Sequence, residues 1–438
     1  MKTSINRDIL KLAIPNILTN LTIPLLGIVD LALMGHLGHE AYIGALALGA
    51  TVFSLLYSGL IFLRMGTTGF TAQSYGAKHF REAINWLGRG IVLALFLGLV
   101  LISFQKPIKY LVFMLIDGSE QVMSLTAEYF NYRIWAAPAS LGVFVFTGWF
   151  LGMQNAKIPL TIALIINVVN IIFSVYFVRF ANMGIQGVAL GTVLAQYSGF
   201  VASAVFLLIY YKRMVLMLSA KLVFHIKSIK RYLKTNVDIL IRSLLITGTF
   251  FYFNVLSAEV NDLVLSVNSV LLQFLWIFAY FIDGFAFAAE SLTGKYVGAK
   301  NKADLKSLIR LLLIWGVGLS ISFSLLNLAL GKQFIALLTD NILVIDNAQT
   351  WFFWVIIIPI IGFLAFMMDG VYIGATATKP MRNVMLVSVL LVFLPAQYFL
   401  LPLWGNNGLW LALILFLLSR GVLLWAFHKP AIYKTEFD

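Results

Sequence analysis

Residues 158–178 read IPLTIALIINVVNIIFSVYFV and contain no charged side chain. A helix needs about 20 predominantly apolar residues to cross the hydrocarbon of a bilayer, whereas strands of outer-membrane barrels alternate over about 10 residues. Similar stretches recur along the 438-residue chain, of which 61% is hydrophobic and 11% charged, and the mean hydropathy is +0.94. The sequence therefore predicts an all-α membrane protein and excludes a soluble globular domain.

The composition also excludes several kinds of chemistry. Because the chain has no cysteine, it has no disulfide, thiol nucleophile or iron–sulfur cluster. The formal net charge of +13 does not indicate a nucleic-acid partner, since basic residues of membrane proteins collect in cytoplasmic loops. Residues 1–16 run into an apolar segment without a small-residue cleavage site, so we expect the first helix to be retained.

Charge clusters and breaks at Gly, Pro and Asn divide the chain into twelve predicted membrane helices. They span residues 9–34, 42–65, 84–105, 129–153, 158–179, 185–211, 238–257, 263–288, 307–329, 350–374, 382–403 and 408–428. Every second loop is basic, and the longest of these, residues 211–236, has Lys and Arg but no Asp or Glu. The positive-inside rule therefore predicts that both termini are cytoplasmic.

The two halves of the chain are internally similar. A shift of 222 residues aligns Tyr75-Gly76-Ala77-Lys78 with Val297-Gly298-Ala299-Lys300, and Gly148 and Gly152 with Gly370 and Gly374. This repeat predicts an N-terminal lobe (1–211), a basic cytoplasmic linker (212–236) and a C-terminal lobe (237–438). Because six helices per lobe is an even number, the copies have the same topology and are related by a pseudo-two-fold axis along the membrane normal, with a cavity between them.

Three motifs carry a resemblance to a known family. Residues 64–73 read RMGTTGFTAQ, residues 75–78 read YGAK and residues 283–286 read DGFA. Their order across both halves resembles the DNA-damage-inducible-F-like subgroup of the multidrug and toxic compound extrusion (MATE) family. The resemblance implies a secondary active exporter that exchanges amphipathic or cationic organic compounds for protons or sodium ions.

Asp30 lies within the first predicted span. A carboxylate in a membrane helix costs about 2.5–3.5 kcal/mol on insertion scales, so it commonly marks a functional site, although an aspartate hydrated at the outer interface is the alternative. Pro24 removes one helical hydrogen bond and allows a bend between Asp30 and the helix start. The family resemblance implies that Asp30 is the residue that couples cation movement to export.

The fifth predicted span carries Asn167, Asn170 and Ser174 at a spacing that puts them on one helix face. Such a face can line a polar pocket or join neighbouring helices. The resemblance implies that Asn170 and, on the sixth span, Thr192 complete a cation site around Asp30. Related sequences often have an aspartate where this chain has Ser174. Since hard cations prefer several charged oxygens, we expect proton coupling, with sodium at Asp30 as the alternative.

The second lobe carries different polar residues. Arg242 and Asp283 are expected at similar depth and can pair, and together with Glu290 they form either a structural ion pair or a proton relay. Tyr252 stands 222 residues after Asp30, so the acid is not repeated. With Trp276 and Tyr280, Tyr252 could form an aromatic wall for cationic substrates, or could pack against lipid.

Other functions have less support from the sequence. His36 and His39 flank the first outer loop without the further ligands that a metal site needs. No phosphate-binding glycine loop of the Walker type and no clustered catalytic set occurs. We therefore expect no enzyme and no cofactor beyond the coupling ion. A lipid-linked oligosaccharide flippase and a major-facilitator-type transporter are the alternatives. The expected protein is a monomer in the bacterial cytoplasmic (inner) membrane, whose partners are the bilayer and small organic substrates.

Overall fold

The computed structural model describes residues 2–36, 40–114, 116 and 118–433. These residues form helices joined by short loops, and no strand occurs among them. Within this part of the chain, twelve helical segments are long and apolar enough to cross a membrane. The predicted fold class and the predicted number of spans are therefore confirmed.

The ends of the spans differ from the prediction. The second span runs from Glu40 to Gly76 rather than over 42–65, and the fourth runs from Glu120 to Gly152 rather than over 129–153. Most of the added residues are polar or small, and helical hydrogen bonding continues through them beyond the apolar stretch. A hydropathy pattern detects only the part of a helix that matches the hydrocarbon, so it shortens such spans.

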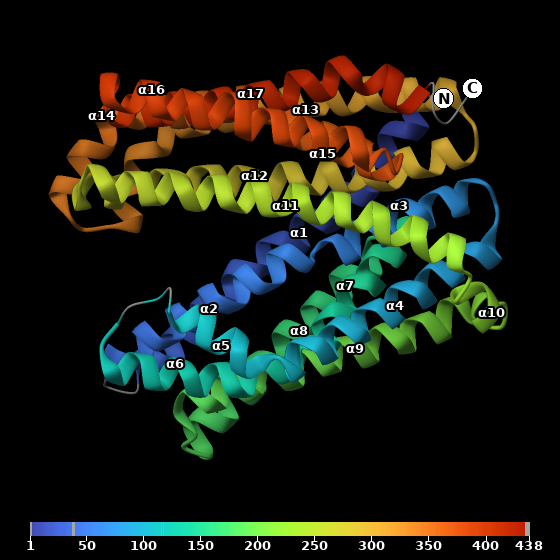
Figure 1. Cartoon of the computed structure of the whole chain (residues 1–438), viewed down its shortest axis with the longest axis horizontal. Helices are drawn as coiled ribbons and strands as arrows, with labels where there is room; N and C mark the ends of the chain where they lie inside the picture. The colour runs from blue at the N-terminus through green and yellow to red at the C-terminus, as the bar shows by residue number, and fades with distance from the viewer. Residues whose placement is uncertain (1, 37–39, 115, 117, 434–438) are drawn as a thin grey trace. The chain divides into compact units, whose positions relative to one another are not determined.

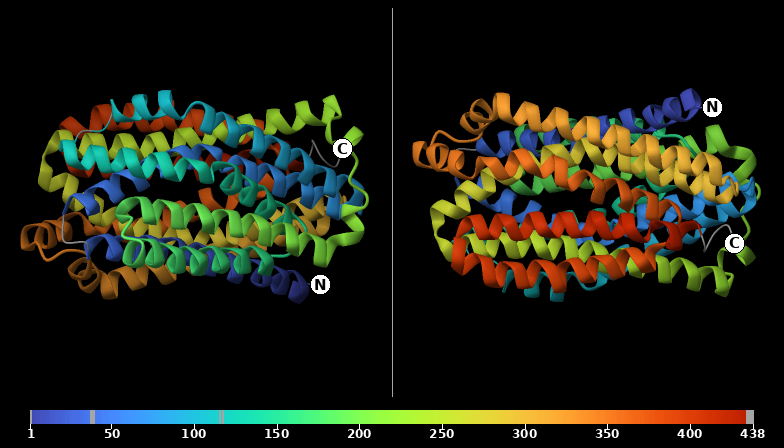
Figure 2. Two further views of the ribbon diagram at one scale, coloured as in Figure 1. Left: turned by 90° about the horizontal axis from the view of Figure 1, so that it is seen from below. Right: turned by 90° about the horizontal axis from the view of Figure 1, so that it is seen from above.

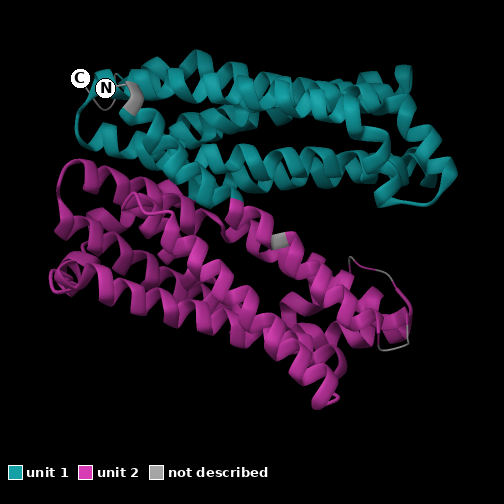
Figure 3. Cartoon of the chain, turned by 180° about the vertical axis from the view of Figure 1, so that it is seen from behind, with its two compact units in different colours: residues 1–17, 237–438 teal, residues 18–236 magenta. Residues whose placement is uncertain are grey.

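The contacts divide the chain into two compact units (Figure 3), here called unit 1 (Met1–Ile17 with Val237–Asp438) and unit 2 (Leu18–Asn236). Two long helices, α1 (Lys2–Gly35) and α11 (Ile226–Val260), contribute residues to both units. The division differs from the expected lobe boundaries because the first turns of α1 belong with the second half of the chain. Likewise, the whole of the expected linker belongs to unit 2, where Tyr232 is buried.

Unit 2 is an all-helical bundle. Its helices are α2 (Glu40–Leu60), α3 (Phe62–Gly76), α4 (Phe80–Ser103), α5 (Gln105–Phe113), α6 (Glu120–Arg133), α7 (Ala137–Gly152), α8 (Lys157–Val175), α9 (Gly184–Val215) and the short α10 (Ala220–Val223). The helix α3 packs against α4 and α7, α2 packs against α6, and α8 packs against α9. Figure 1 shows α4, α7 and α9 running alongside one another.

Unit 1 repeats this plan with longer helices. They are α12 (Asp262–Gly298), α13 (Lys302–Leu338), α14 (Ile342–Gly374), α15 (Thr378–Val387), α16 (Leu394–Trp404) and α17 (Asn406–His428). The helix α12 packs against α13 and α14, and α17 packs against α14 and α16. The views in Figure 2 show α16 and α17 side by side.

Asparagine side chains fix the starts of three helices in unit 1. The Oδ1 atoms of Asn261, Asn301 and Asn341 accept hydrogen bonds at 2.8, 3.0 and 3.0 Å from backbone N–H groups in the first turns of α12, α13 and α14. The first N–H groups of a helix have no partner within the helix, so an asparagine at this position satisfies one of them. Each loop therefore ends where its asparagine stands.

The internal repeat is visible in the backbone. Lys78 and Lys300, 222 residues apart, both have positive φ, 59° and 52°, and so do Gln154 and Thr376, at 63° and 52°. Non-glycine residues rarely adopt this conformation. Its recurrence at two pairs of matched positions shows that the two halves share loop geometry as well as sequence.

Glycines at matched positions let helices approach to backbone contact. A Cβ atom at Gly148 of α7 would lie 2.2 Å from the carbonyl oxygen of Arg64 in α3. A Cβ atom at Gly370 of α14 would lie 2.2 Å from the carbonyl oxygen of Ala286 in α12. These distances exclude any side chain larger than hydrogen, so the same contact joins equivalent helices in both units.

We predict that Gly148→Ala and Gly370→Ala each destabilise the protein by at least about 1–3 kcal/mol, because the added methyl group must separate two helices. The measurement is the apparent melting temperature of the detergent-purified protein. Gly318→Ala in α13 is the matched control, since nothing lies within 4 Å of a Cβ atom there. A Gly148→Ala variant that melts together with the parent would contradict the prediction.

Candidate functional site

Asp30 lies in α1 of unit 2, and its side chain is buried, with a relative exposure of 8%. Its Oδ1 atom is enclosed and accepts no hydrogen bond from the described residues. The neighbouring turn of α1 contributes Leu33 and Met34 to the apolar cluster of unit 2. An enclosed carboxylate in a membrane-spanning helix is costly unless a proton or a positive charge accompanies it.

The predicted polar face of α8 points in part toward α9. Asn170 Nδ2 donates to Thr192 Oγ1 at 3.0 Å, and Thr192 Oγ1 donates to the carbonyl oxygen of Val188 at 2.9 Å. Ser174 is fully buried on the same face. A Cβ atom at Gly191 would lie 2.5 Å from Ser174 Oγ, so this glycine lets α9 approach the serine. The structure therefore brings Asn170, Thr192 and Ser174 together.

Asn167 faces a different neighbour. Its Nδ2 atom donates to the carbonyl oxygen of Thr22 in α1 at 3.5 Å. This contact links α8 to the turn of α1 that precedes Pro24. The helix α1 runs without interruption from Lys2 to Gly35, so a bend at Pro24 stays a prediction.

Sequence reasoning missed a buried arginine near Asp30. Arg133 is the last residue of α6, has a relative exposure of 9%, and acts electrostatically on the Asp30 carboxylate. Its guanidinium lies 5.2 Å from the ring centroid of Phe53 and 5.6 Å from that of Tyr57. Tyr129, one turn earlier in α6, interacts electrostatically with both Arg133 and Asp30.

The signal for Arg133 was present in the sequence. This residue falls inside the predicted fourth span, and a charge inside a membrane helix normally has a partner or a function. The electrostatic interaction could not be predicted, because Asp30 and Arg133 are far apart in the chain and only folding brings α1 and α6 into range of each other. Cation–π contacts with Phe53 and Tyr57 help to compensate for the buried guanidinium.

The charged residues of unit 1 include ion pairs that the sequence did not predict. Arg242 Nη1 lies 2.8 Å from Asp369 Oδ2, and Arg420 Nη2 contacts the same oxygen. Asp283 and Glu290 are near enough to act on the charge of Arg242. Arg242 therefore forms an ion pair with Asp369, which the sequence did not single out, although both Asp369 and Arg420 lie inside predicted spans. The predicted pairing of Arg242 with Asp283 and Glu290 stays a prediction.

The aromatic residues proposed as a substrate wall are partly exposed. Trp276 packs against Phe250, with ring centroids 4.9 Å apart, and Phe250 belongs to the apolar core of unit 1. Tyr252 is about one-third exposed, and Tyr280 lies within electrostatic range of Asp283. Their contact with a substrate stays a prediction. His36 Nδ1 lies 2.7 Å from the carbonyl oxygen of Ala32, and His39 lies outside the described residues.

The geometry defines a polytopic helical membrane protein with one enclosed carboxylate in the first half and an enclosed ion-pair cluster in the second. Comparison with known families agrees with this class. The MatE family model matches residues 15–176 and 239–399, two segments of similar length that lie one in each half of the chain. The chain belongs to the MatE family and is a multi-pass membrane transporter of the MATE type.

Individual relatives support the subgroup. The chain is 37% identical over 432 residues to DNA damage-inducible protein F of Escherichia coli, covering 98% of this chain and 93% of that protein. It is 23% identical over 450 residues to the probable multidrug resistance protein NorM of Thermotoga maritima, covering 99% of this chain and 94% of that protein. The resemblance to the DNA-damage-inducible-F-like subgroup is therefore confirmed.

Solved structures show the same fold. The eukaryotic MATE transporter AtDTX14 superposes with a TM-score of 0.88 at 16% identity, covering 99% of both chains. The Vibrio cholerae MATE transporter VcmN in the bent form superposes with a TM-score of 0.86 at 17% identity, covering 99% of this chain and 98% of that chain. At this identity the likeness establishes the arrangement of helices and nothing finer.

We predict that Asp369→Asn destabilises the protein by about 3–5 kcal/mol, because two buried guanidinium groups then lose their shared carboxylate. Thermal unfolding in detergent measures the effect. Lys295→Gln is the matched control, since it removes a pair with Asp8 at 3.5 Å whose side chains are about one-third exposed and which is worth about 0–1 kcal/mol. Equal loss of stability in both variants would show that Asp369 is not a structural ion-pair partner.

Proposed function

We propose that this protein is a proton-coupled antiporter that exports amphipathic or cationic organic compounds across the bacterial cytoplasmic membrane, with both termini in the cytoplasm. The observation that carries this proposal is the enclosed Asp30 carboxylate in a membrane-spanning helix. A carboxylate in such surroundings can bind and release a proton. Because burial disfavours the charged form, the protonated side chain is more stable in an enclosed site and the ionised side chain in a hydrated one.

Arg133 supports protons over sodium as the coupling ion. A guanidinium that already acts on Asp30 supplies a fixed positive charge at the site. A sodium ion would have to enter against this charge, and Ser174 provides no second carboxylate to compensate. A proton instead forms a covalent bond with the carboxylate and requires no ring of oxygen ligands.

The mechanism that we propose begins with protonation of Asp30. Neutralising the carboxylate removes its attraction to Arg133 and the cost of its burial, so α1 can change its packing against α6 and α8. Pro24 is the natural bending point, because the backbone there lacks one hydrogen bond. The hydrogen bond from Asn167 to Thr22, at 3.5 Å, would change with this bend and so transmit it to the polar residues on α8. Substrate is released as the pocket of the N-terminal half shrinks.

We predict that Asp30→Asn abolishes proton-driven export of a fluorescent organic cation from proteoliposomes. The amide cannot take part in the protonation cycle, so acidifying the external medium should no longer accelerate loss of the dye. Asp8→Asn is the matched control, since it makes the same substitution on α1 at a carboxylate that is about one-third exposed and should keep the parental rate. Export by Asp30→Asn at the parental rate would refute the mechanism.

We predict that Arg133→Gln allows a sodium gradient to drive export, because it removes the fixed positive charge beside Asp30. Arg133→Lys keeps a charge and should stay insensitive to sodium, which makes it the matched control. The measurement compares dye export under a sodium gradient and under a pH gradient of equal size. If parent and Arg133→Gln respond equally to sodium, Arg133 does not determine the coupling ion.

A further inference from the structure

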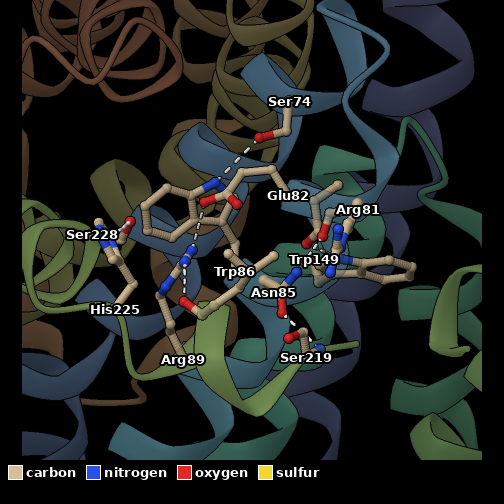
Figure 4. A network of polar contacts seen from close by, with 12 residues as sticks. Ser74, Arg81, Glu82, Asn85, Trp86, Arg89, Trp149, Ser219, His225 and Ser228 are labelled. Carbon is tan, nitrogen blue, oxygen red and sulfur yellow. Dashed lines mark hydrogen bonds and ion pairs between the residues drawn. The ribbon is translucent and has the colours of Figure 1, made fainter. Parts of the chain in front are cut away.

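The segment between α9 and α11 is docked on the end of α4 that carries basic residues. Arg89 Nη2 of α4 donates to the carbonyl oxygen of Leu222 at 2.6 Å. The backbone N–H of Ser219 donates to Asn85 Oδ1 at 3.1 Å, and Figure 4 shows these two residues next to each other. A Cβ atom at Gly88 would lie 2.7 Å from Val223, so glycine allows the short helix α10 to lie directly on α4. The segment therefore has a defined position.

Arg89 is itself held in place by its neighbours. Its guanidinium forms an ion pair with Glu82 at 2.8 Å and lies 4.1 Å from the ring centroid of Trp86. Trp86 Nε1 donates to Ser74 Oγ at 3.2 Å, as Figure 4 shows. Because Glu82 compensates the charge of Arg89, this network anchors the segment without itself offering an anion site.

An apolar groove lies between α4, α9 and α10. Its volume is about 420 Å³, and its lining includes Leu87, Ile91 and Val92 of α4, Leu207 of α9, and Leu218 and Val223 of the docked segment. This volume is in the range of about 300–1,000 Å³ that is common for ligand clefts. Ile91 and Val92 lie inside a membrane span, and Val92 has a relative exposure of 43%, so the size and apolar lining of the groove suit an acyl chain of the bilayer.

Exposed basic residues occur beside this groove. Val215 and Ala220 line the groove. Arg213 lies two residues before Val215, and Lys221 directly follows Ala220. No acidic residue occurs between residues 211 and 236 to compensate these charges. Exposed large apolar side chains occur in the same segment, and Leu216 and Ile226 have relative exposures of 80% and 68%. A combination of exposed basic and apolar side chains is typical of segments that lie in a membrane interface.

We propose that the groove binds an acidic phospholipid from the leaflet at this membrane surface, with an acyl chain between α4, α9 and α10 and the phosphate near Arg213 and Lys221. The apolar lining selects a lipid chain, and the uncompensated basic charge selects an acidic headgroup over a zwitterionic one. Bound lipid would hold the segment between α9 and α11 against α4, in addition to the contacts of Arg89 and Asn85.

The experiment measures binding of phosphatidylglycerol and phosphatidylcholine to the purified full-length protein in detergent by native mass spectrometry. We expect the parent to prefer phosphatidylglycerol. In the double variant Arg213→Gln with Lys221→Gln, affinity for phosphatidylglycerol should fall about 10- to 30-fold, from the contribution of two basic residues near a membrane surface. The double variant Lys306→Gln with Arg310→Gln loses equal charge in α13 and should bind like the parent.

A groove-filling variant tests the position of the acyl chain. Val92→Trp should reduce binding of phosphatidylglycerol, and its melting temperature shows whether it is folded. Equal binding of both lipids by the parent, parental affinity in Arg213→Gln with Lys221→Gln, or an equal fall in both double variants would overturn the proposal. So would parental lipid binding by folded Val92→Trp, because the lipid would then lie elsewhere. The outcome does not depend on the coupling ion, so failure here leaves the role of Asp30 unaffected.

Discussion

The structure depends on close approach of helix backbones. Lipid tails are as apolar as leucine side chains, so burial of apolar surface does not hold membrane helices together, and packing at small residues must do so. Gly148 against the Arg64 carbonyl and Gly370 against the Ala286 carbonyl provide this contact in the two units. Both contacts join helices that carry buried polar residues or pack against helices that do. The helix spacing at these glycines therefore influences the distances between the buried polar side chains.

The two halves of the chain conserve this packing but not their charges. Steric contacts tolerate almost no substitution, whereas a buried charge can be replaced once its partner is also replaced. Unit 2 therefore has Asp30 with Arg133 nearby, while unit 1 has Asp369 between Arg242 and Arg420. A carboxylate held by two guanidinium groups stabilises helix packing, and a carboxylate with a less complete set of partners is better suited to change its protonation state.

The segment between α9 and α11 adds a membrane-facing surface to this plan. The side chains of Arg89 and Asn85 hold this segment on α4 by hydrogen bonds to its backbone. The basic side chains of the segment are therefore not needed to keep it in position. Those residues remain exposed beside an apolar groove. The charge of a loop that sets membrane orientation can in this way also contribute to a specific lipid site.

The sequence by itself determined the fold class, the number of spans, the internal repeat and the family, because each of these depends on the order and spacing of residues along the chain. Polar residues inside apolar stretches are conspicuous, so the sequence also singled out Asp30, Asn170 and Ser174 as candidate site residues, and the family resemblance added Thr192. The tertiary structure alone decided which charges interact: Arg133 acts on Asp30, and Asp369 forms ion pairs with both Arg242 and Arg420. Charge pairing depends on the rotation and packing of helices that are distant in the sequence, and hydropathy contains no information about either.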